Sequence, residues 1–144
     1  MEKLTDCEEL VMKTVWDAGE ELSLMEIMQK VNDKYHKEWK PQTVSTFLAR
    51  LVRKGYLRHY RQGRVFFYQI LIPLEDYKSR LTEDFINFWH KESIGSMISE
   101  QITTLREIGE DPEGCCYPQE YLQEVINEAA NTIEFLCVKL QVKF

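Results

Sequence analysis

Residues 43–68 constrain the fold of this chain more strongly than any other stretch of its sequence. Apolar side chains there recur at the i, i+3, i+4, i+7 spacing of a buried helical stripe, formed by Val44, Phe47, Leu48 and Leu51. A polar stripe lies on a different side of the same predicted helix and consists of Thr43, Thr46, Arg50 and Arg53. Lys54-Gly55 predicts the helix end, because it puts a cation at the negative end of the helix dipole and a glycine just past it.

A predicted β-hairpin follows this helix directly. Two β-rich runs, 56–61 and 64–70, are separated by Gln62-Gly63, which is the two-residue kind of connection that hairpins favour. A short helix with one polar face, followed by a basic hairpin, is typical of a winged helix-turn-helix domain in which the hairpin is the wing. The sequence therefore predicts a mainly α-helical protein with a small β-hairpin.

The charge distribution singles out the same region. Residues 34–64 contain nine of the 18 Lys and Arg residues and a single carboxylate, Glu38, which gives a local net charge of +8. The rest of the chain is strongly acidic, so the net charge of the whole is −6. A positive excess confined to one short region of an acidic chain indicates a surface for a polyanion, and we expect double-stranded DNA.

The predicted DNA contacts follow from this helix and hairpin. A major groove admits one α-helix, whose N-terminal half usually contacts base edges and phosphates, and this half carries Gln42, Thr43, Ser45 and Thr46. The basic side chains are expected mainly to hold phosphates, and these are Lys40, Arg50, Arg53 and Lys54 of the helix region and Arg58, Arg61 and Arg64 of the wing. For any one of them an ordinary solvated surface is an equally good explanation, and the combined charge excess is what favours DNA.

Two further helices are predicted before residue 36. Thr5 and Glu8 have the spacing of a capping box at the start of the first helix, and Gly19 is its natural end. Ser23 and Glu26 repeat the capping box at the start of the second helix. Together with the wing they complete a predicted winged helix-turn-helix domain over residues 1–72.

Residues 73–144 are predicted to form a helical dimerisation and regulatory domain. The expected dimer interface consists of the apolar side chains of two consecutive helical stretches, Leu81, Phe85, Phe88, Trp89, Ile94, Met97, Ile98 and Ile102. The segment 109–114 predicts a break, and a last helix is expected from Pro118 to Leu140. One monomer offers too little apolar surface to cover these side chains, which favours a homodimer. The alternative is that these helices fold back on the winged domain.

No metal, cofactor or catalytic site is predicted. The four cysteines lack the spacing of a zinc site or a disulfide scaffold, and Cys115-Cys116 is either a loop without function or a sensor of oxidants or metal. No nucleophile elbow or phosphate-binding glycine loop is present, so an enzyme is not expected. The longest uncharged stretch, 65–74, is shorter than the ~20 residues that cross a bilayer. We expect a cytoplasmic protein.

Residues 4–77 resemble the bacterial penicillinase and methicillin-resistance repressors of the BlaI/MecI/CopY type. The resemblance is carried by the first helix, the helix 43–55, the wing sequence from Arg61 to Tyr68, and Tyr77 at the start of a linker helix. It implies a homodimeric repressor whose winged domains bind a palindromic operator and whose C-terminal helices form the dimer.

The same resemblance implies an inducing signal that this sequence does not match. In the β-lactam branch a partner protease cuts an Asn-Phe bond in a C-terminal helix, where this chain has Glu100-Gln101. Its only Asn-Phe pair, Asn87-Phe88, lies earlier in the chain. Copper-responsive relatives carry two Cys-x-Cys pairs, which the cysteines of this chain do not reproduce. The inducer or protease stays unidentified.

One alternative function is left open by the sequence. Winged helices also serve as protein-interaction modules without sequence-specific DNA binding, in which case the basic surface would contact an acidic protein. Titration with random duplex at low salt distinguishes the two, because only a DNA-binding protein should show affinity that falls steeply with salt.

Overall fold

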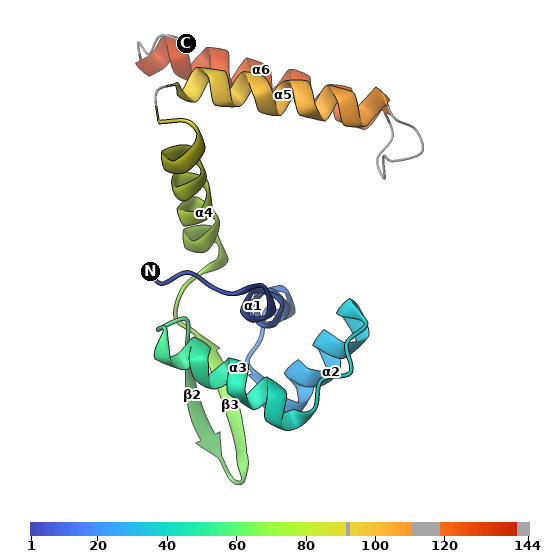
Figure 1. Ribbon diagram of the computed structural model, residues 1–144, viewed down its shortest axis with the longest axis vertical. Coiled ribbons are helices and arrows are strands. Elements are labelled where there is room, and N and C mark those ends of the chain that lie inside the picture. Colours follow the sequence, from blue (N-terminus) through green and yellow to red (C-terminus); the bar gives the residue numbers. More distant parts are fainter. Residues whose placement is uncertain (92, 111–118, 141–144) are drawn as a thin grey trace. The chain divides into compact units, whose positions relative to one another are not determined.

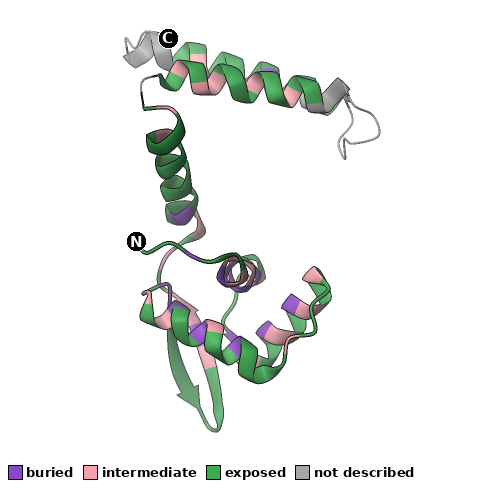
Figure 2. Ribbon diagram, in the orientation of Figure 1, coloured by how far each residue is buried: buried purple, intermediate pink, exposed green. Residues whose placement is uncertain are grey.

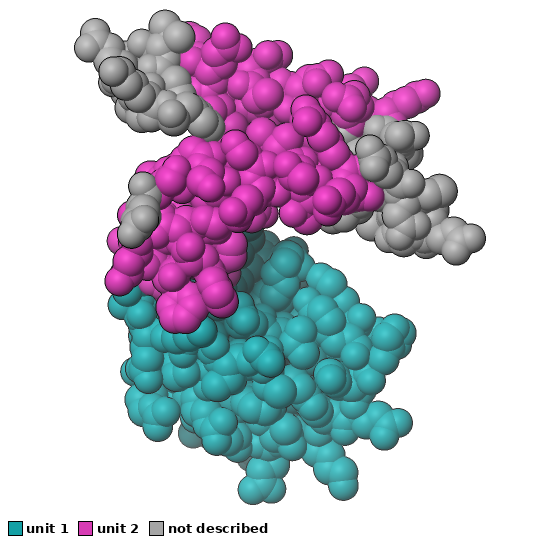
Figure 3. Space-filling model, turned by 45° about the horizontal axis from the view of Figure 1, so that its top comes forward, with its two compact units in different colours: residues 1–80 teal, residues 81–144 magenta. Residues whose placement is uncertain are grey.

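A computed structural model describes residues 1–91, 93–110 and 119–140. Its helices are α1 (Asp6–Ala18), α2 (Leu24–Tyr35), α3 (Pro41–Arg53), α4 (Leu74–Trp89), α5 (Ile94–Glu110) and α6 (Gln119–Leu140), and its strands are β1 (Leu22–Ser23), β2 (Leu57–Gln62) and β3 (Val65–Ile70) (Figure 1). The protein is thus mainly α-helical with a small antiparallel sheet, as predicted. The chain divides into two compact units, Met1–Arg80 and Leu81–Phe144 (Figure 3).

Both predicted capping boxes are confirmed. At the start of α1 the Thr5 hydroxyl accepts the Glu8 N–H at 3.4 Å, and the Glu8 carboxylate accepts the Thr5 N–H at 3.0 Å. Ser23 and Glu26 repeat this exchange at the start of α2, at 3.3 and 3.0 Å. Gly19 ends α1 in the left-handed region with φ of +67°, a conformation that glycine adopts without steric cost.

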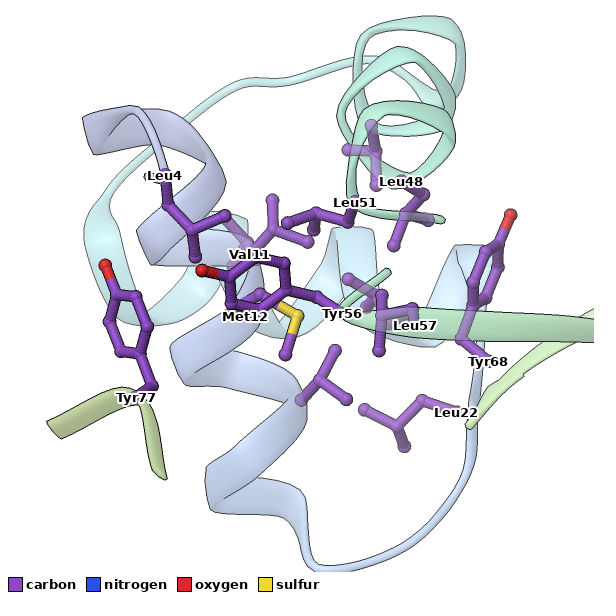
Figure 4. Packing of buried hydrophobic residues seen from close by; sticks show 14 residues of the cluster. Leu4, Val11, Met12, Leu22, Leu48, Leu51, Tyr56, Leu57, Tyr68 and Tyr77 are labelled. Carbon is purple, nitrogen blue, oxygen red and sulfur yellow. The ribbon is translucent and has the colours of Figure 1, made fainter. Parts of the chain in front are cut away.

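The core of the first unit lies where α1, α2 and α3 meet the base of the hairpin. Val44, Leu48 and Leu51 of α3 are fully buried, as predicted for the apolar stripe, and Phe47 is half-buried beside them. Figure 2 shows how buried and exposed positions are distributed along the helices. The three buried side chains of α3 pack in one cluster that also contains Val11, Met12, Val15, Leu22, Ile27, Val31, Tyr56, Leu57 and Tyr68 (Figure 4). Burial of these apolar groups fixes which side of α3 faces solvent.

The hairpin differs from its prediction in two respects. The strand order is β1-β3-β2, and the two-residue strand β1, which was not predicted, pairs Leu22 with Tyr68. The prediction of a Gln62-Gly63 loop was wrong, because Gln62 pairs with Val65 and the loop is Gly63-Arg64. Gly63 adopts a positive φ of +66°, which glycine accepts without steric cost. It is the first residue of the two-residue loop, whereas the sequence predicted it as the second.

In the second unit α5 and α6 pack side by side and run in opposite directions (Figure 1). The helix α6 confirms the predicted last helix, and Ile126 is buried on it. The predicted break at 109–114 begins too early, because α5 continues through Glu110. Cys115 and Cys116 lie outside the described residues.

The part of the chain that the structure describes contains neither a membrane-spanning helix nor a cluster of metal ligands. No helix in this part of the chain is long and apolar enough to cross a bilayer. In the same residues, no group of three or more His, Cys, Asp or Glu side chains is placed to hold a metal ion.

Candidate nucleic-acid interface

The polar stripe of α3 faces solvent along the whole helix. Pro41 is the first helical residue, which suits a position whose N–H has no helical partner, and Lys40 precedes it as the cap residue. The side chains exposed here are those predicted to contact DNA, Lys40, Gln42, Thr43, Ser45, Thr46, Arg50 and Arg53. The structure therefore brings hydroxyl, amide and cationic groups together on one exposed helix face.

The turn before α3 is fixed by two hydrogen bonds of the Asn32 side chain, which the sequence did not predict. The Asn32 amide accepts the Trp39 N–H and donates to the Trp39 carbonyl, both at 3.0 Å. The Trp39 ring packs on Phe47 with centroids 5.0 Å apart, and the Arg50 guanidinium lies 6.0 Å from the Phe47 centroid. These contacts join the end of α2, the turn and the middle of α3, so the position of Arg50 depends on all three.

The Thr46 hydroxyl already has one partner within α3. It donates to the Gln42 carbonyl at 3.0 Å, one helical turn earlier. A hydroxyl has one donor hydrogen and two acceptor lone pairs, so in this rotamer the outward capacity of Thr46 is to accept. Its methyl group remains available for apolar contact with a thymine methyl.

Lys54 lies apart from the exposed basic residues. Its ammonium donates to the Glu8 carboxylate at 2.7 Å and to the Lys3 carbonyl at 2.9 Å. The Lys54 and Glu8 side chains are only 8% and 1% exposed. Burial acts to raise the pKa of Glu8, but hydrogen bonds from Lys54 and Thr5 and the Lys54 charge outweigh it, so this pKa lies below its ordinary value. The structure thus gives Lys54 a partner inside the domain.

The three wing arginines are all exposed but differ in their surroundings. Arg64 occupies the loop between β2 and β3. Arg58 donates to the Gln69 side chain across the strand pair. Arg61 donates through Nε to the Gly63 carbonyl at 2.9 Å and lies over the Phe66 ring. Because residues three apart on a strand point to opposite faces, Arg58 and Arg61 do not share a surface.

The start of α4 is attached to α1 by contacts between residues distant in sequence. The Trp16 indole donates to the Ile72 carbonyl at 3.0 Å, and the Tyr77 hydroxyl donates to the Glu9 carboxylate at 2.6 Å. The Trp16 and Tyr77 rings pack with centroids 5.2 Å apart. Burial, followed by the hydrogen bond to Glu9, raises the pKa of Tyr77, which keeps the phenol protonated. This is why the first compact unit extends past the predicted boundary at residue 72.

The predicted dimer residues belong to α4 and α5. Phe88 and Trp89, at the end of α4, are 74% and 67% exposed and touch each other edge to face at 4.6 Å. Leu81, Phe85 and Ile94 are also exposed, and Met97, Ile98 and Ile102 are half-buried. The Asn87-Phe88 pair lies in the last turn of α4, and Glu100-Gln101 lies in α5.

Residues 4–112 match the family model of the penicillinase repressor. This chain belongs to the penicillinase repressor family. A relative in that family, the penicillinase repressor of Bacillus licheniformis, is 31% identical over 96 residues, which cover 67% of this chain and 73% of the relative. The methicillin resistance regulatory protein MecI of Staphylococcus aureus (strain N315) is 26% identical over 96 residues, 67% of this chain and 76% of MecI.

A solved structure is also similar to this family member. It is the monomeric form of BlaI from Bacillus licheniformis in complex with the blaP half-operator, with 34% identity and a TM-score of 0.44. The match covers 53% of this chain and 89% of the BlaI chain. Membership of the family makes this chain a transcriptional repressor and not an enzyme.

Proposed function

We propose that this repressor acts in the cytoplasm as a homodimer that binds a palindromic operator. The observation that supports this most directly is the division of α3, whose apolar stripe is buried while its hydroxyls and guanidiniums face solvent. Gln42, Thr43, Ser45 and Thr46 would contact base edges, and Lys40, Arg50 and Arg53 would hold phosphates. Arg61 and Arg64 would add wing contacts to the backbone, and Lys54 is left out because it pairs with Glu8.

The exposed apolar residues of α4 and α5 support the homodimer. Large aromatic side chains that meet solvent close together mark interaction surfaces in soluble proteins. Phe88 and Trp89 form such a pair, and Leu81, Phe85 and Ile94 add to it. A two-fold axis through this surface would offer DNA two copies of α3, which suits two half-sites of opposite orientation.

Selection of bound sites from a random duplex pool, followed by footprinting, tests the proposal as a whole. We expect a two-fold symmetric site whose half-sites are centred ~34 Å apart, about one helical turn of DNA, or a multiple of this. An asymmetric site would contradict the dimeric arrangement. Recovery of no preferred site would contradict specific binding altogether.

Replacement of Thr46 by Ala should weaken binding to the selected site by about 1–3 kcal/mol and leave binding to random duplex unchanged. The change removes an acceptor and a methyl group from the exposed face of α3 without touching the core. Fluorescence anisotropy with both duplexes measures the two affinities. Equal losses on specific and random DNA would remove Thr46 from the residues that determine specificity.

Replacement of Arg64 by Ala should weaken binding to all sequences by a similar factor. Arg64 occupies the wing loop, where a guanidinium contacts phosphate and releases counterions. The slope of log affinity against log salt should therefore fall by about 1. An unchanged slope would show that Arg64 contacts no phosphate.

A further inference from the structure

The wing has two faces that differ in chemistry. Strand pairing aligns Arg61 with Phe66 and His59 with Tyr68, so these four side chains share one face. At the base of the hairpin this face is buried through Leu57 and Tyr68, which pack in the core cluster with Leu48 of α3 (Figure 4). Toward the loop the same face, which packs in the core cluster with α3 at its base, becomes exposed.

A series of rings runs along this face from the core to the loop. Tyr68 is buried, and its ring lies 6.1 Å from that of His59. The His59 ring meets Phe66 edge to face, at 5.4 Å and 86°. The Arg61 guanidinium then lies over the Phe66 ring, 5.7 Å from its centroid. Phe66 therefore contacts both the His59 ring and the Arg61 guanidinium.

The Arg61 guanidinium is held at two points and still has hydrogens to donate. Its Nε donates to the Gly63 carbonyl at 2.9 Å, and the Phe66 ring attracts its positive charge. The described residues supply no acceptor for the Nη hydrogens of Arg61, which form the fork that matches a phosphate. A guanidinium that is already oriented loses less side-chain entropy when it binds.

On the opposite face of the wing, Arg58 and Tyr60 have polar partners within the first unit. Arg58 donates to Gln69, and the Tyr60 hydroxyl donates to the Glu21 carboxylate. The Tyr60 and Phe67 rings stack at 5.8 Å. The Glu21 carboxylate on this face would repel a phosphate, whereas no carboxylate among the described residues is paired with Arg61 on the other face.

We propose that Phe66 is a positioning residue, whose ring holds the Arg61 guanidinium on the α3 side of the wing for contact with a DNA phosphate. This rests on the proposed function, since it specifies how the wing of a DNA-binding repressor contacts the backbone. It also explains why a phenylalanine that is 44% exposed lies near the end of the hairpin. Arg58, on the other face, makes no such contact.

The test uses the full chain, a random-sequence fluorescent duplex and a salt titration. Four changes are compared, Phe66→Leu, Phe66→Tyr, Arg61→Ala and the double change Phe66→Leu with Arg61→Ala. Tyr60→Leu and Arg58→Ala are the matched controls, because they remove a stacked aromatic ring and a guanidinium from the opposite face. The Arg61 Nε–H resonance of the DNA-free protein is recorded as well, since a ring beneath a guanidinium shifts it upfield.

We expect Phe66→Leu to weaken binding about two- to fivefold, the range for an exposed cation–π contact. The Tyr variant should bind like the unaltered protein, and the Arg61 resonance should lose its upfield shift only in the Leu variant. Arg61→Ala should lower the salt slope by about 1, and adding Phe66→Leu should cause no further loss. Arg58→Ala should weaken binding less than Arg61→Ala, and Tyr60→Leu less than Phe66→Leu. Thermal unfolding of every variant distinguishes the loss of a DNA contact from the loss of the fold.

Three outcomes would overturn the proposal. If Phe66→Leu causes the same loss in the Arg61→Ala background, Phe66 acts independently of Arg61. If Arg58→Ala or Tyr60→Leu weakens binding as much, the two faces do not differ. If the unaltered protein fails to bind duplex with a salt-dependent affinity, the proposed function fails with it, whereas the first two outcomes leave that function intact.

Discussion

Replacing Lys54 by Met should lower the free energy of unfolding by about 3 kcal/mol, because it leaves the buried Glu8 carboxylate without its cation. The pair joins the start of α1 to the end of α3, so its loss affects the domain that presents the polar stripe. Urea unfolding followed by tryptophan fluorescence measures the change, since Trp16 and Trp39 both lie in the first unit.

The pH dependence of this effect has a definite sign. The pKa of Glu8 is lowered in the folded protein, so its contribution to stability is present above the unfolded pKa and is lost as the pH falls through the folded value. In the Lys54→Met variant protonation relieves the unpaired charge. The difference in stability between the two proteins should therefore be large near pH ~7 and shrink below about pH 4.

Lys34→Met is the matched control. Lys34 pairs with Asp17 at 2.6 Å, but these side chains are 49% and 34% exposed, so its replacement should destabilise the protein far less than Lys54→Met. Adding Glu8→Gln to Lys54→Met should recover most of the loss, because the amide oxygen can still accept the Thr5 N–H. Equal losses for Lys54→Met and Lys34→Met would contradict the buried pair.

Replacing Phe88 by Asp should dissociate the proposed dimer and weaken binding to a symmetric operator by about 10²- to 10⁴-fold. Phe88 is the most exposed large apolar side chain of the described residues, and a carboxylate there would have to be buried between two subunits. Binding to an isolated half-site should stay unchanged, since residues 1–80 are not altered. Sedimentation velocity and titration with both duplexes give the two measurements.

Met25→Asp is the control for this change. Met25 is also an exposed apolar residue, but it lies in the first turn of α2, in the first unit. The Met25→Asp change should leave both the oligomeric state and operator affinity unaltered. A Phe88→Asp protein that sediments as a dimer would show that the subunits associate through another surface.

The features that could be predicted from the sequence are those set by neighbouring residues. In each capping box, Thr5 with Glu8 and Ser23 with Glu26, the two residues are three apart and satisfy each other's backbone N–H groups. The starts of α1 and α2 were therefore predicted correctly. The apolar stripe of α3 was predicted from its period for the same reason. Each of these patterns is contained in a short stretch of neighbouring residues.

The features that escaped prediction depend on residues far apart in the chain. Lys54 and Glu8 are 46 residues apart, so a lysine near the end of a basic helix looked no different from one that faces solvent. The strand β1 is only two residues long, which is too short to show a period. The loop was misplaced by one residue because glycine can occupy either central position of a two-residue turn.

The alternation of side chains along a strand distinguishes two of the wing arginines from sequence alone. Side chains alternate along a strand, so Arg58 and Arg61 had to lie on opposite faces whatever the tertiary structure. The predicted set of DNA contacts included both. The two-residue period of the strand separates them, so only one of the two can contact DNA from a given face of the wing.

The first residues of the chain are structural parts of the domain that carries α3. The Glu2 carbonyl accepts the Tyr56 hydroxyl at 2.5 Å, and the Lys3 carbonyl accepts the Lys54 ammonium. Leu4 is buried in the core cluster. Removal of residues 1–4 would take away these acceptors and loosen the turn between α3 and the wing.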